Sequence, residues 1–384
     1  CRRSGDASTT PTWTVGDGWV VARCRFGPGR REILAGSARD VGRVGKWVAP
    51  RARWAEPGPV TTYDTPGDAT GDAPGDTPGE QADLLGWVHA RLEVFGLAVE
   101  GRVSWPHVRP WGVVVRVPTA SGPVWAKAVE PALRHEVAVT TLLARRRPDA
   151  VAPVLGADPA RGWLLLADAG ETLREVAARE RTLAPWHDAL ALYASVQRDV
   201  ASEAAALLDD GLPDLRLPRL PDLYADLVGR LAPDLGDVGA SALAALPLLR
   251  DLCAELAATG LPDTLQHDDL HDAQVFVRDG RVRLLDWGDA CLSHPFLTLA
   301  VTLDGVLAWG LDDEEASEDT TPYLESYLAG WAGAGSPDQL VAASRAARRL
   351  GWACRAVNGH VPQDPESLRT TRTRLRMFLD GRAG

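Results

Sequence analysis

Apolar and polar residues recur along the chain in patterns that predict most of its elements. "EQADLLGWVHARLEVFGL" has apolar positions at helical spacing and predicts an amphipathic helix. The runs "VEGRVS", "WGVVVRVPT" and "GPVWAKAVE" are rich in β-branched residues and predict three strands, with a hairpin turn at the Ser-Gly between the last two. The segment "SWPHVRPWG" is expected to connect the first two of these strands without joining the sheet.

The pattern changes from strand-rich to helical near residues 166–170. "PALRHEVAVTTLLARRR" has helical spacing with Pro131 at its start, and "VAPVLGADPARGWLLLADAG" predicts two strands around a turn. After residue 170 we expect helices everywhere except in the stretch 265–290. The fold class is therefore α+β, with a small antiparallel-sheet lobe at 81–169 that contains one inserted helix. A larger, mostly helical lobe follows at 170–384.

The first 80 residues differ from the rest in composition. Residues 1–60 carry a net charge of +6 and no clear period, and we interpret them as poorly ordered or as spurious translated sequence, with a small independent domain as the alternative. Residues 61–80 contain TPGD, ATGD, APGD and TPGE in tandem. Repeats of Pro, Gly and Asp cannot bury apolar surface, so this segment is expected to be a disordered linker.

Composition narrows the possible partners. The net charge of −11 disfavours nucleic acid and anionic membranes, and is compatible with a cationic substrate. No run of apolar residues is long enough to span a bilayer. The five cysteines are scattered without a C-x-x-C pair, which favours a reducing, cytoplasmic location. The start lacks both Met and an apolar signal core, and we expect a truncated or mis-assigned start over a processed lipoprotein.

The stretch 265–290, "LQHDDLHDAQVFVRDGRVRLLDWGDA", concentrates six aspartates around two short β-branched runs. The Asp279-Gly280 pair predicts a two-residue hairpin turn, which pairs Gln274 with Leu285 and places Gln274 next to Asp286. Clustered carboxylates repel unless they share a cation or a proton, and oxygen ligands suit Mg²⁺. A solvated acidic loop that caps the hairpin is the alternative.

Four further features resemble those of kinases. The segment from His267 to Gln274 matches the catalytic loop H-R-D-L-x-x-x-N, with Gln in place of Asn, and Asp286-Trp-Gly stands where D-F-G stands. "VWAK", ending at Lys127, matches V-A-I-K on a predicted strand. Glu136 lies at the border of the apolar stripe of the following helix, where its side chain can reach Lys127. An exposed Lys at a strand end and a solvated helical Glu are the alternatives.

With these motifs the chain resembles the aminoglycoside phosphotransferase family, whose loop usually reads H-G-D-L-H-x-x-N. The resemblance covers roughly 85–380, and its specific motifs lie in 124–136 and 265–290. It implies a bilobal protein-kinase-like fold, ATP and Mg²⁺, and a small-molecule acceptor.

The resemblance also implies a role for each matching residue. Asp269 matches the catalytic base, and Asp286 and Gln274 match the metal ligands. Lys127 matches the lysine that binds the α- and β-phosphates and is held by Glu136. The segment Leu166-Ala167-Asp168 falls where the hinge offers backbone groups to adenine.

Two departures from the family pattern bear on activity. No G-x-G-x-x-G loop is present, so no phosphate-covering segment is assigned. Gln274 offers the same carbonyl ligand as Asn on a side chain one methylene longer, and a misplacement of about 1 Å can cost on the order of 100-fold in rate. The expected function is Mg- and ATP-dependent transfer of the γ-phosphoryl group to a hydroxyl of a small polar molecule, with an aminoglycoside-like acceptor as one candidate. The alternatives are a nucleotide-binding pseudokinase and a kinase of an amino-alcohol, a sugar or a macrolide. The sequence does not define the oligomeric state.

Overall fold

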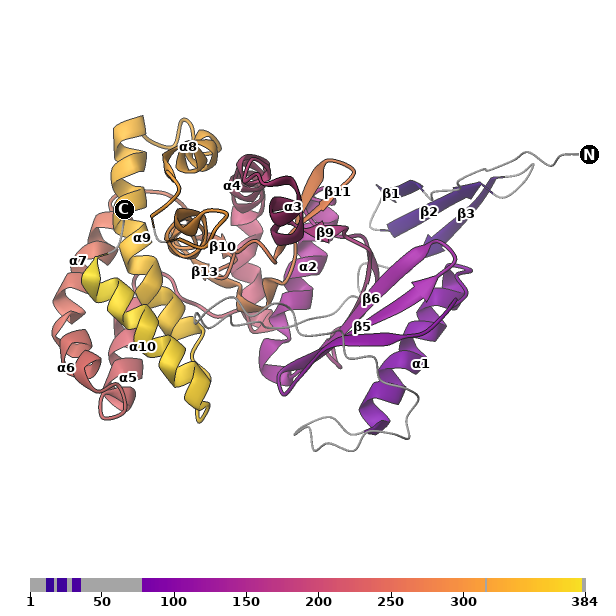
Figure 1. The fold of residues 1–384 in the computed structure, drawn as a ribbon, viewed down its shortest axis with the longest axis horizontal. Coiled ribbons are helices and arrows are strands. Elements are labelled where there is room, and N and C mark those ends of the chain that lie inside the picture. The colour runs from indigo at the N-terminus through magenta and orange to yellow at the C-terminus, as the bar shows by residue number, and fades with distance from the viewer. Residues whose placement is uncertain (1–11, 17–18, 26–29, 36–77, 315, 382–384) are drawn as a thin grey trace, which may run out of the picture. The chain divides into compact units, whose positions relative to one another are not determined.

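The structure is a computed structural model that describes residues 12–16, 19–25, 30–35, 78–314 and 316–381. The chain divides into two compact units, with the boundary between Asp168 and Ala169 (Figure 1). The predicted linker at 61–80 lies outside the described residues except for its last three, which begin helix α1. Most of the 1–60 segment also lies outside them, so the interpretation of that segment stays a prediction.

The first unit consists of antiparallel sheets and two α-helices. Strands β1–β3 form a three-stranded sheet of their own, and five later strands form a second sheet in the order β4-β5-β6-β8-β7. Helix α2 is inserted between β6 and β7, as the sequence predicted. The elements are β1 (Thr12–Gly16), β2 (Trp19–Arg25), β3 (Arg30–Ala35), α1 (Pro78–Val94), β4 (Ser104–Arg109), β5 (Gly112–Thr119), β6 (Gly122–Val129), η1 (Pro131–Leu133), α2 (His135–Arg146), β7 (Val154–Asp158) and β8 (Trp163–Ala167).

Alternation along the strands gives the five-stranded sheet two apolar faces. On one face, Val115 of β5 and Ala126 of β6 pack with Val88 of α1 in one buried cluster. On the other face, Leu164 of β8 packs with Val137 of α2 in a second cluster. Because successive strand residues point to opposite faces, the residue after Ala126 points to the face that α2 covers.

The prediction for the first strand of this sheet was wrong. Within "VEGRVS", Val99 forms an isolated bridge with Thr119, and the last residue, Ser104, begins β4. Strand β4 lies in "SWPHVRPWG", the segment that was expected to be a connection. Strand β4 lies at the edge of the sheet and its pairing with β5 is irregular between Ser104 and His107. An edge strand tolerates Pro106, which has no amide hydrogen to donate to a neighbour.

The second unit is mostly helical, with three short strand pairings among the helices (Figure 1). The elements are β9 (Glu171–Thr172), α3 (Leu173–Glu180), α4 (Pro185–Ala204), η2 (Ala205–Asp210), α5 (Leu220–Leu231), α6 (Asp237–Ala244), α7 (Leu246–Ala257), β10 (Thr264–Gln266), β11 (Val275–Arg278), β12 (Arg281–Leu284), η3 (Trp287–Asp289), β13 (Cys291–Ser293), the π-helical η4 (Ala300–Asp304), η5 (Leu307–Trp309), α8 (Thr321–Ala329), α9 (Pro337–Asn358) and α10 (Pro365–Asp380).

Strands β10 and β13 enclose the stretch that held the candidate motifs. They pair antiparallel, with Gln266 opposite Cys291, so the chain enters and leaves the motif region side by side. The sequence did not predict β9 or β13, because strands of two or three residues are too short to show a period of two.

A buried polar network on helix α4 supports this pair of strands. The side-chain amide of Gln197 donates to the carbonyl oxygens of Leu265 and Pro295, at 3.1 and 2.9 Å. The hydroxyl of Tyr327 donates to Oε1 of Gln197 at 2.6 Å. Because all these groups are buried, their hydrogen bonds fix β10 and the segment after β13 against α4.

Candidate active site

Lys127 and Glu136 form an ion pair in the first unit. Lys127 follows Ala126 on β6, so its side chain points toward helix α2, whose first turn contains Glu136. The Nζ–Oε1 distance is 3.4 Å, and the Glu136 side chain is only 3% exposed. The predicted pairing is therefore confirmed, and the alternative of a solvated helical Glu is excluded.

The segment Leu166-Ala167-Asp168 lies at the end of β8. The amide of Ala167 donates to the carbonyl oxygen of Pro153 at 2.9 Å, so this amide is already paired. The indole Nε1 of Trp125 donates to Oδ1 of Asp168, also at 2.9 Å. The amide of Ala167 is therefore not available to adenine, and the predicted contact would have to use other backbone groups of the segment.

The hairpin of β11 and β12 has the predicted register. Val275 pairs with Leu284 and Val277 with Val282, and the amide of Leu285 donates to the carbonyl oxygen of Gln274 at 2.9 Å. Asp279 and Gly280 both have positive φ, 53° and 69°, as a type I′ turn requires. The turn therefore places Gln274 beside the residue that precedes Asp286.

His267 holds the start of the catalytic-loop motif to the Asp286 segment. Its Nε2 lies 2.9 Å from the carbonyl oxygen of Leu285, and its ring contacts that of Trp287 with centroids 4.7 Å apart. Its amide donates to the hydroxyl of Tyr193 at 3.0 Å. Burial lowers the pKa of His267, so the ring is neutral at pH 7 and has one N–H to donate.

Asp269 is held by a buried arginine from α9. The Nε of Arg355 donates to Oδ1 of Asp269 at 3.2 Å, and Nη2 lies 3.0 Å from Oδ2. That second oxygen is buried, and among the described residues it has no hydrogen-bond partner. Arg355 thus contacts both carboxylate oxygens, through a hydrogen bond to Oδ1 and an ion pair with Oδ2, and Oδ2 has acceptor capacity left.

Arg355 also joins two aspartates for which the sequence offered no role. Its guanidinium donates to both carboxylate oxygens of Asp289, at 2.9 and 3.2 Å, and lies 3.8 Å from Oδ2 of Asp268. Burial alone would lower the pKa of the guanidinium, but the carboxylates of Asp269, Asp289 and Asp268 hold it above its usual value. Arg355 is therefore charged, and it neutralises part of the acidic cluster.

Asn358 ties Asp268 to the Asp289 segment. Its Nδ2 donates to Oδ2 of Asp268 at 2.8 Å and to the carbonyl oxygen of Asp289 at 2.7 Å. Asp268 has a positive φ of 61°, and its amide donates to Oγ1 of Thr298. Burial raises the pKa of Asp268 to about 7, against the opposing effects of Arg355 and Asn358.

Gln274 is oriented by His271. Its Nε2 lies 3.2 Å from Nε2 of His271, and it is buried like the histidine. Within the described part of the chain, the carbonyl oxygen Oε1 of Gln274 makes no hydrogen bond. The amide nitrogen is therefore used for positioning, and the oxygen is the atom that could bind a cation.

Asp272 and Asp286 differ in environment. Burial alone would raise the pKa of Asp272, but hydrogen bonds from His271 and Arg174 outweigh it and lower the pKa to about 2. Arg174 of α3 reaches both oxygens of Asp272, at 2.7 and 3.0 Å, so this carboxylate fixes the loop to α3. Asp286 is partly exposed, has a positive φ of 62°, and immediately precedes η3.

The donor set fits a hard divalent cation. Asp286 and Gln274 supply a carboxylate and an amide oxygen, which are the ligand types that Mg²⁺ prefers. Asp272 is engaged by Arg174, and Asp289 by Arg355. As the motif match implies, Asp286 and Gln274 are the residues that would hold the ion.

Sequence reasoning missed Arg355, Asn358 and Arg174. Arg355 lies seven positions after Arg348, which is also buried and bonds Asp304. Residues seven apart share a helix face, and most of the residues between these two arginines are apolar. Two arginines on the apolar face of a helix need buried acidic partners, and this was the signal available.

Three solved structures resemble this chain in fold. The ethanolamine kinase of Plasmodium vivax has a TM-score of 0.51 at 13% identity and covers 77% of this chain and 88% of its own. The choline kinase of Cryptosporidium parvum has a TM-score of 0.52 at 11% identity, covering 73% and 88%. The ternary complex of streptomycin, ATP and APH(2″)-IIa has a TM-score of 0.52 at 12% identity, covering 77% and 98%.

These likenesses and the two units define the class of the protein as a kinase-like α+β fold, and the predicted fold class is confirmed. The sequence profile of the phosphotransferase enzyme family matches residues 102–342, well over half of the chain. The chain belongs to this family of phosphotransferases, as its motifs predicted. Among curated proteins, no sequence match was found. In the described part of the chain, no helix is long and apolar enough to cross a bilayer.

Proposed function

We propose that the protein transfers the γ-phosphoryl group of ATP to a hydroxyl group of a small polar molecule, with Mg²⁺ as the resident metal. The observation that supports this most strongly is the environment of Asp269. Arg355 fixes its carboxylate through a hydrogen bond to Oδ1 and an ion pair with Oδ2, and the buried Oδ2 accepts no hydrogen bond among the described residues. An acceptor hydroxyl can donate its proton to that oxygen.

In this proposal Asp269 orients the acceptor hydroxyl and receives its proton as the oxygen attacks phosphorus. Such a base contributes typically 10²–10⁴-fold in rate. Arg355 keeps the carboxylate in place, and His267 fixes the loop against the Asp286 segment. Phosphoryl transfer depends mainly on positioning and on neutralisation of charge.

The nucleotide half of the proposal rests on Lys127. Its ammonium is held by the buried carboxylate of Glu136 at 3.4 Å, and 19% of its side chain is exposed. A lysine held in this way can neutralise the α- and β-phosphates. Asp286 and Gln274 would hold Mg²⁺, which would neutralise phosphate charge when bound.

The acceptor is proposed by chemical class. Solved structures that share this fold include an ethanolamine kinase, a choline kinase and a complex with streptomycin, which all involve small hydroxylated amines. The net charge of −11 is compatible with a cationic acceptor. We therefore include amino-alcohols and aminoglycosides in the panel below, together with sugars and macrolides.

The experiment is incubation of the full chain with Mg-ATP and this panel, followed by mass spectrometry of the acceptors and measurement of ADP. The proposal predicts one acceptor class that gains a phosphate with matching ADP release, and no product when Mg²⁺ is chelated. Bound ATP without transfer to any acceptor would favour the pseudokinase alternative. Two departures from the family pattern motivate that alternative: Gln274 stands where the family has Asn, and the glycine-rich loop is missing.

A further inference from the structure

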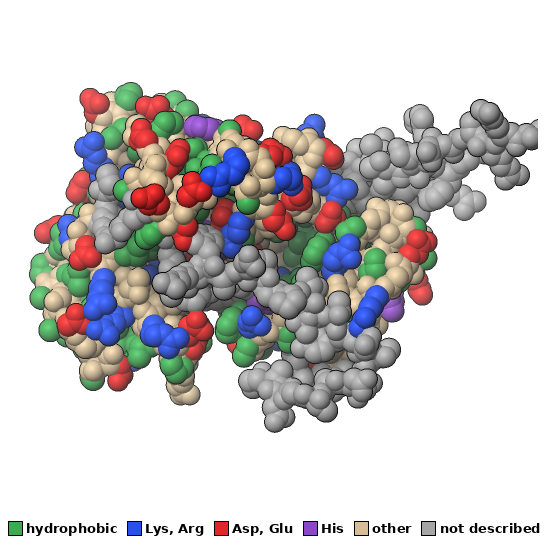
Figure 2. All heavy atoms as spheres, in the orientation of Figure 1, with side chains coloured by type: hydrophobic (Ala, Val, Ile, Leu, Met, Phe, Trp, Pro, Cys, Tyr) green, Lys and Arg blue, Asp and Glu red, His purple; other side chains and the backbone are tan. Residues whose placement is uncertain are grey.

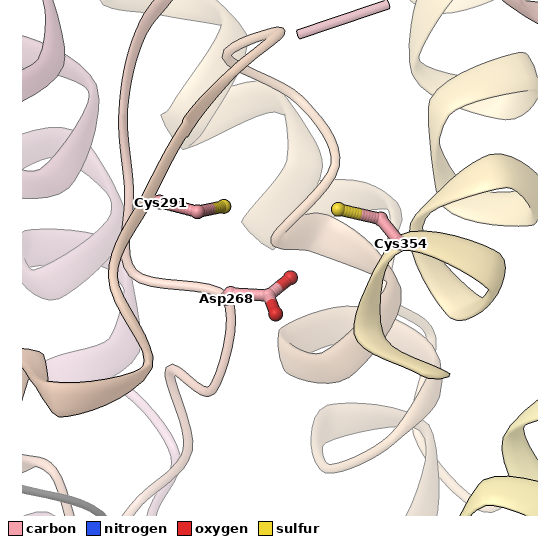
Figure 3. A group of neighbouring side chains, drawn as sticks. All are labelled: Asp268, Cys291 and Cys354. Atoms are coloured by element: carbon pink, nitrogen blue, oxygen red, sulfur yellow. The ribbon is translucent and has the colours of Figure 1, made fainter. Parts of the chain in front are cut away.

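Two cysteines and an aspartate lie close together near Asp269. Cys291 lies on β13, Cys354 on α9, and Asp268 two residues after the end of β10. One ligand atom from each lies within 4.8 Å of the other two, and all three residues are buried. In Figure 3 the two sulfur atoms point toward one another, and the carboxylate of Asp268 lies beside the space between them.

This donor set differs from that of the proposed magnesium site. Two sulfur ligands and one carboxylate oxygen suit a thiophilic cation such as Zn²⁺, and they do not suit Mg²⁺ or Ca²⁺. Cys253 is also buried and free, but it is not part of the group. The three ligands come from three separate segments, as is usual for a structural metal site that joins parts of a fold.

Both cysteines of the group are free and buried. A bound metal deprotonates a coordinating thiol outright, so both sulfur atoms are available as ligands.

The acidic surroundings of the group are compatible with a cation. Three carboxylates of the motif stretch share the guanidinium of Arg355, and Arg374 interacts electrostatically with the same carboxylates. A cavity of about 440 Å³ lies between the α4–α5 segment and the end of α9, and Asn358, which donates to Asp268 at 2.8 Å, forms part of its lining.

We propose that Cys291, Cys354 and Asp268 form a zinc site. On binding, Zn²⁺ replaces the protons of both thiols, which leave to solvent, and no electron is transferred. Two thiolates balance the charge of the ion, and the carboxylate faces Arg355. The bound ion would link Asp268 to β13 and α9, and it would thereby also restrain the adjoining Asp269.

The test uses Co²⁺ as a spectroscopic probe and Zn²⁺ as its competitor. The full chain, carrying Cys1→Ser and Cys24→Ser to remove the two thiols near its start, is stripped with a chelator and titrated with Co²⁺ under reducing conditions. We expect one equivalent to bind with thiolate-to-cobalt charge-transfer absorption and tetrahedral d–d bands, and Zn²⁺ to displace it. Binding should also raise Tm, because the ion binds only the folded chain.

Variants assign the ligands. Cys291→Ser and Cys354→Ser should each lose the charge-transfer band, while Cys253→Ser, the matched control, should retain it. Asp268→Asn should keep the band with weaker binding, because both thiolates remain. The proposal is overturned if the folded parent takes up no Co²⁺ or Zn²⁺, or if the band persists in both single variants. A Cys291–Cys354 disulfide in protein isolated under reducing conditions would overturn it as well.

Discussion

At the scale of single residues, one guanidinium organises the acidic cluster. Arg355 bonds Asp269 and Asp289 and lies near Asp268, although these residues come from different parts of the motif stretch. Asp272 instead bonds Arg174. Like charges can lie close together here because the two arginines neutralise part of their charge.

Gln274 is the residue on which the metal proposal depends most. Replacement by Ala removes the only oxygen that this side chain offers, so we expect the Mg²⁺ concentration for half-maximal phosphotransfer to rise about 10- to 100-fold. The measurement is a Mg²⁺ titration of activity at fixed ATP.

A matched variant separates ligation from positioning. His271→Ala removes the partner of the Gln274 amide but leaves the oxygen, so it should raise the Mg²⁺ requirement less than Gln274→Ala does. An unchanged Mg²⁺ requirement in Gln274→Ala would remove this residue from the site. The pseudokinase alternative is correct if the wild-type chain has no phosphotransfer activity and the Gln274→Asn variant has it.

The lowered pKa of Asp214 predicts a pH-dependent contribution to stability. Hydrogen bonds from Arg216, and then Arg219, lower its pKa below the usual 3.8. A lowered folded-state pKa stabilises the fold above pH 3.8, and this contribution is lost as the pH falls through the folded-state value. Asp214→Asn should therefore reduce the free energy of unfolding by roughly 1 kcal/mol at neutral pH, since both arginines are exposed to screening solvent.

Chemical denaturation of the wild type and of Asp214→Asn at neutral pH and below pH 3.8 measures this loss of unfolding free energy. The two unfolding free energies should converge below pH 3.8. A difference that stays constant into acid would show that the charge of Asp214 is not what stabilises the segment.

Residue-level prediction succeeded where the partner is local and failed where it is distant. Lys127 and Glu136 are nine positions apart, and strand alternation with helical spacing was sufficient to pair them. Asp269 and Arg355 are 86 positions apart, and no spacing rule connects a loop to a helix at that separation. The motifs identified the acidic residues, but only the fold could identify the arginine that neutralises part of their charge.

At the scale of elements, close packing of α9 against the segment before η4 positions Arg355. A Cβ on Gly351 would lie 2.2 Å from the carbonyl oxygen of Leu297 and 2.8 Å from the Cβ of Ala300. Gly351 lies about one helical turn before Arg355, so any displacement here moves the guanidinium relative to Asp269.

Gly351→Ala should therefore destabilise the protein by about 2–3 kcal/mol and reduce phosphotransfer activity, since backbone atoms must shift to admit the methyl group. Gly229→Ala on α5 is the matched control, because a Cβ there meets nothing within 4 Å. The control should gain about 1 kcal/mol from its better helix propensity. Denaturation curves test both variants, and equal effects would contradict the close packing assigned to Gly351.

Element prediction followed the strength of each local pattern. The Asp279-Gly280 turn fixed the register of β11 and β12 because the turn type determines which residues pair. Strand β4 was missed because Pro106 and an irregular pairing interrupt its alternation, and only its place at the sheet edge makes Pro acceptable. The short strands β9 and β13 depend on partners distant in sequence.

At the scale of the whole molecule, the order of the motifs proved more informative than composition. A net charge of −11 is shared by many classes of protein, and the face drawn in Figure 2 shows acidic and basic side chains interspersed. Lysine, glutamate, catalytic loop and metal loop in the right order predicted the fold class and the family. The acceptor could not be predicted, because the helices after residue 290 contain no motif that indicates one. A reducing, cytoplasmic location also stays a prediction.

The most direct measurement is transfer of phosphate from labelled ATP to the acceptor found in the panel, by the wild type, Asp269→Asn and Asp279→Asn. Asp279 is an exposed turn residue, so its variant is a chemically matched control. We predict that Asp269→Asn lowers kcat by about 10²–10⁴-fold while ATP binding is retained, and that Asp279→Asn transfers phosphate like the wild type. An Asp269→Asn variant that transfers phosphate at the wild-type rate would contradict the proposed function.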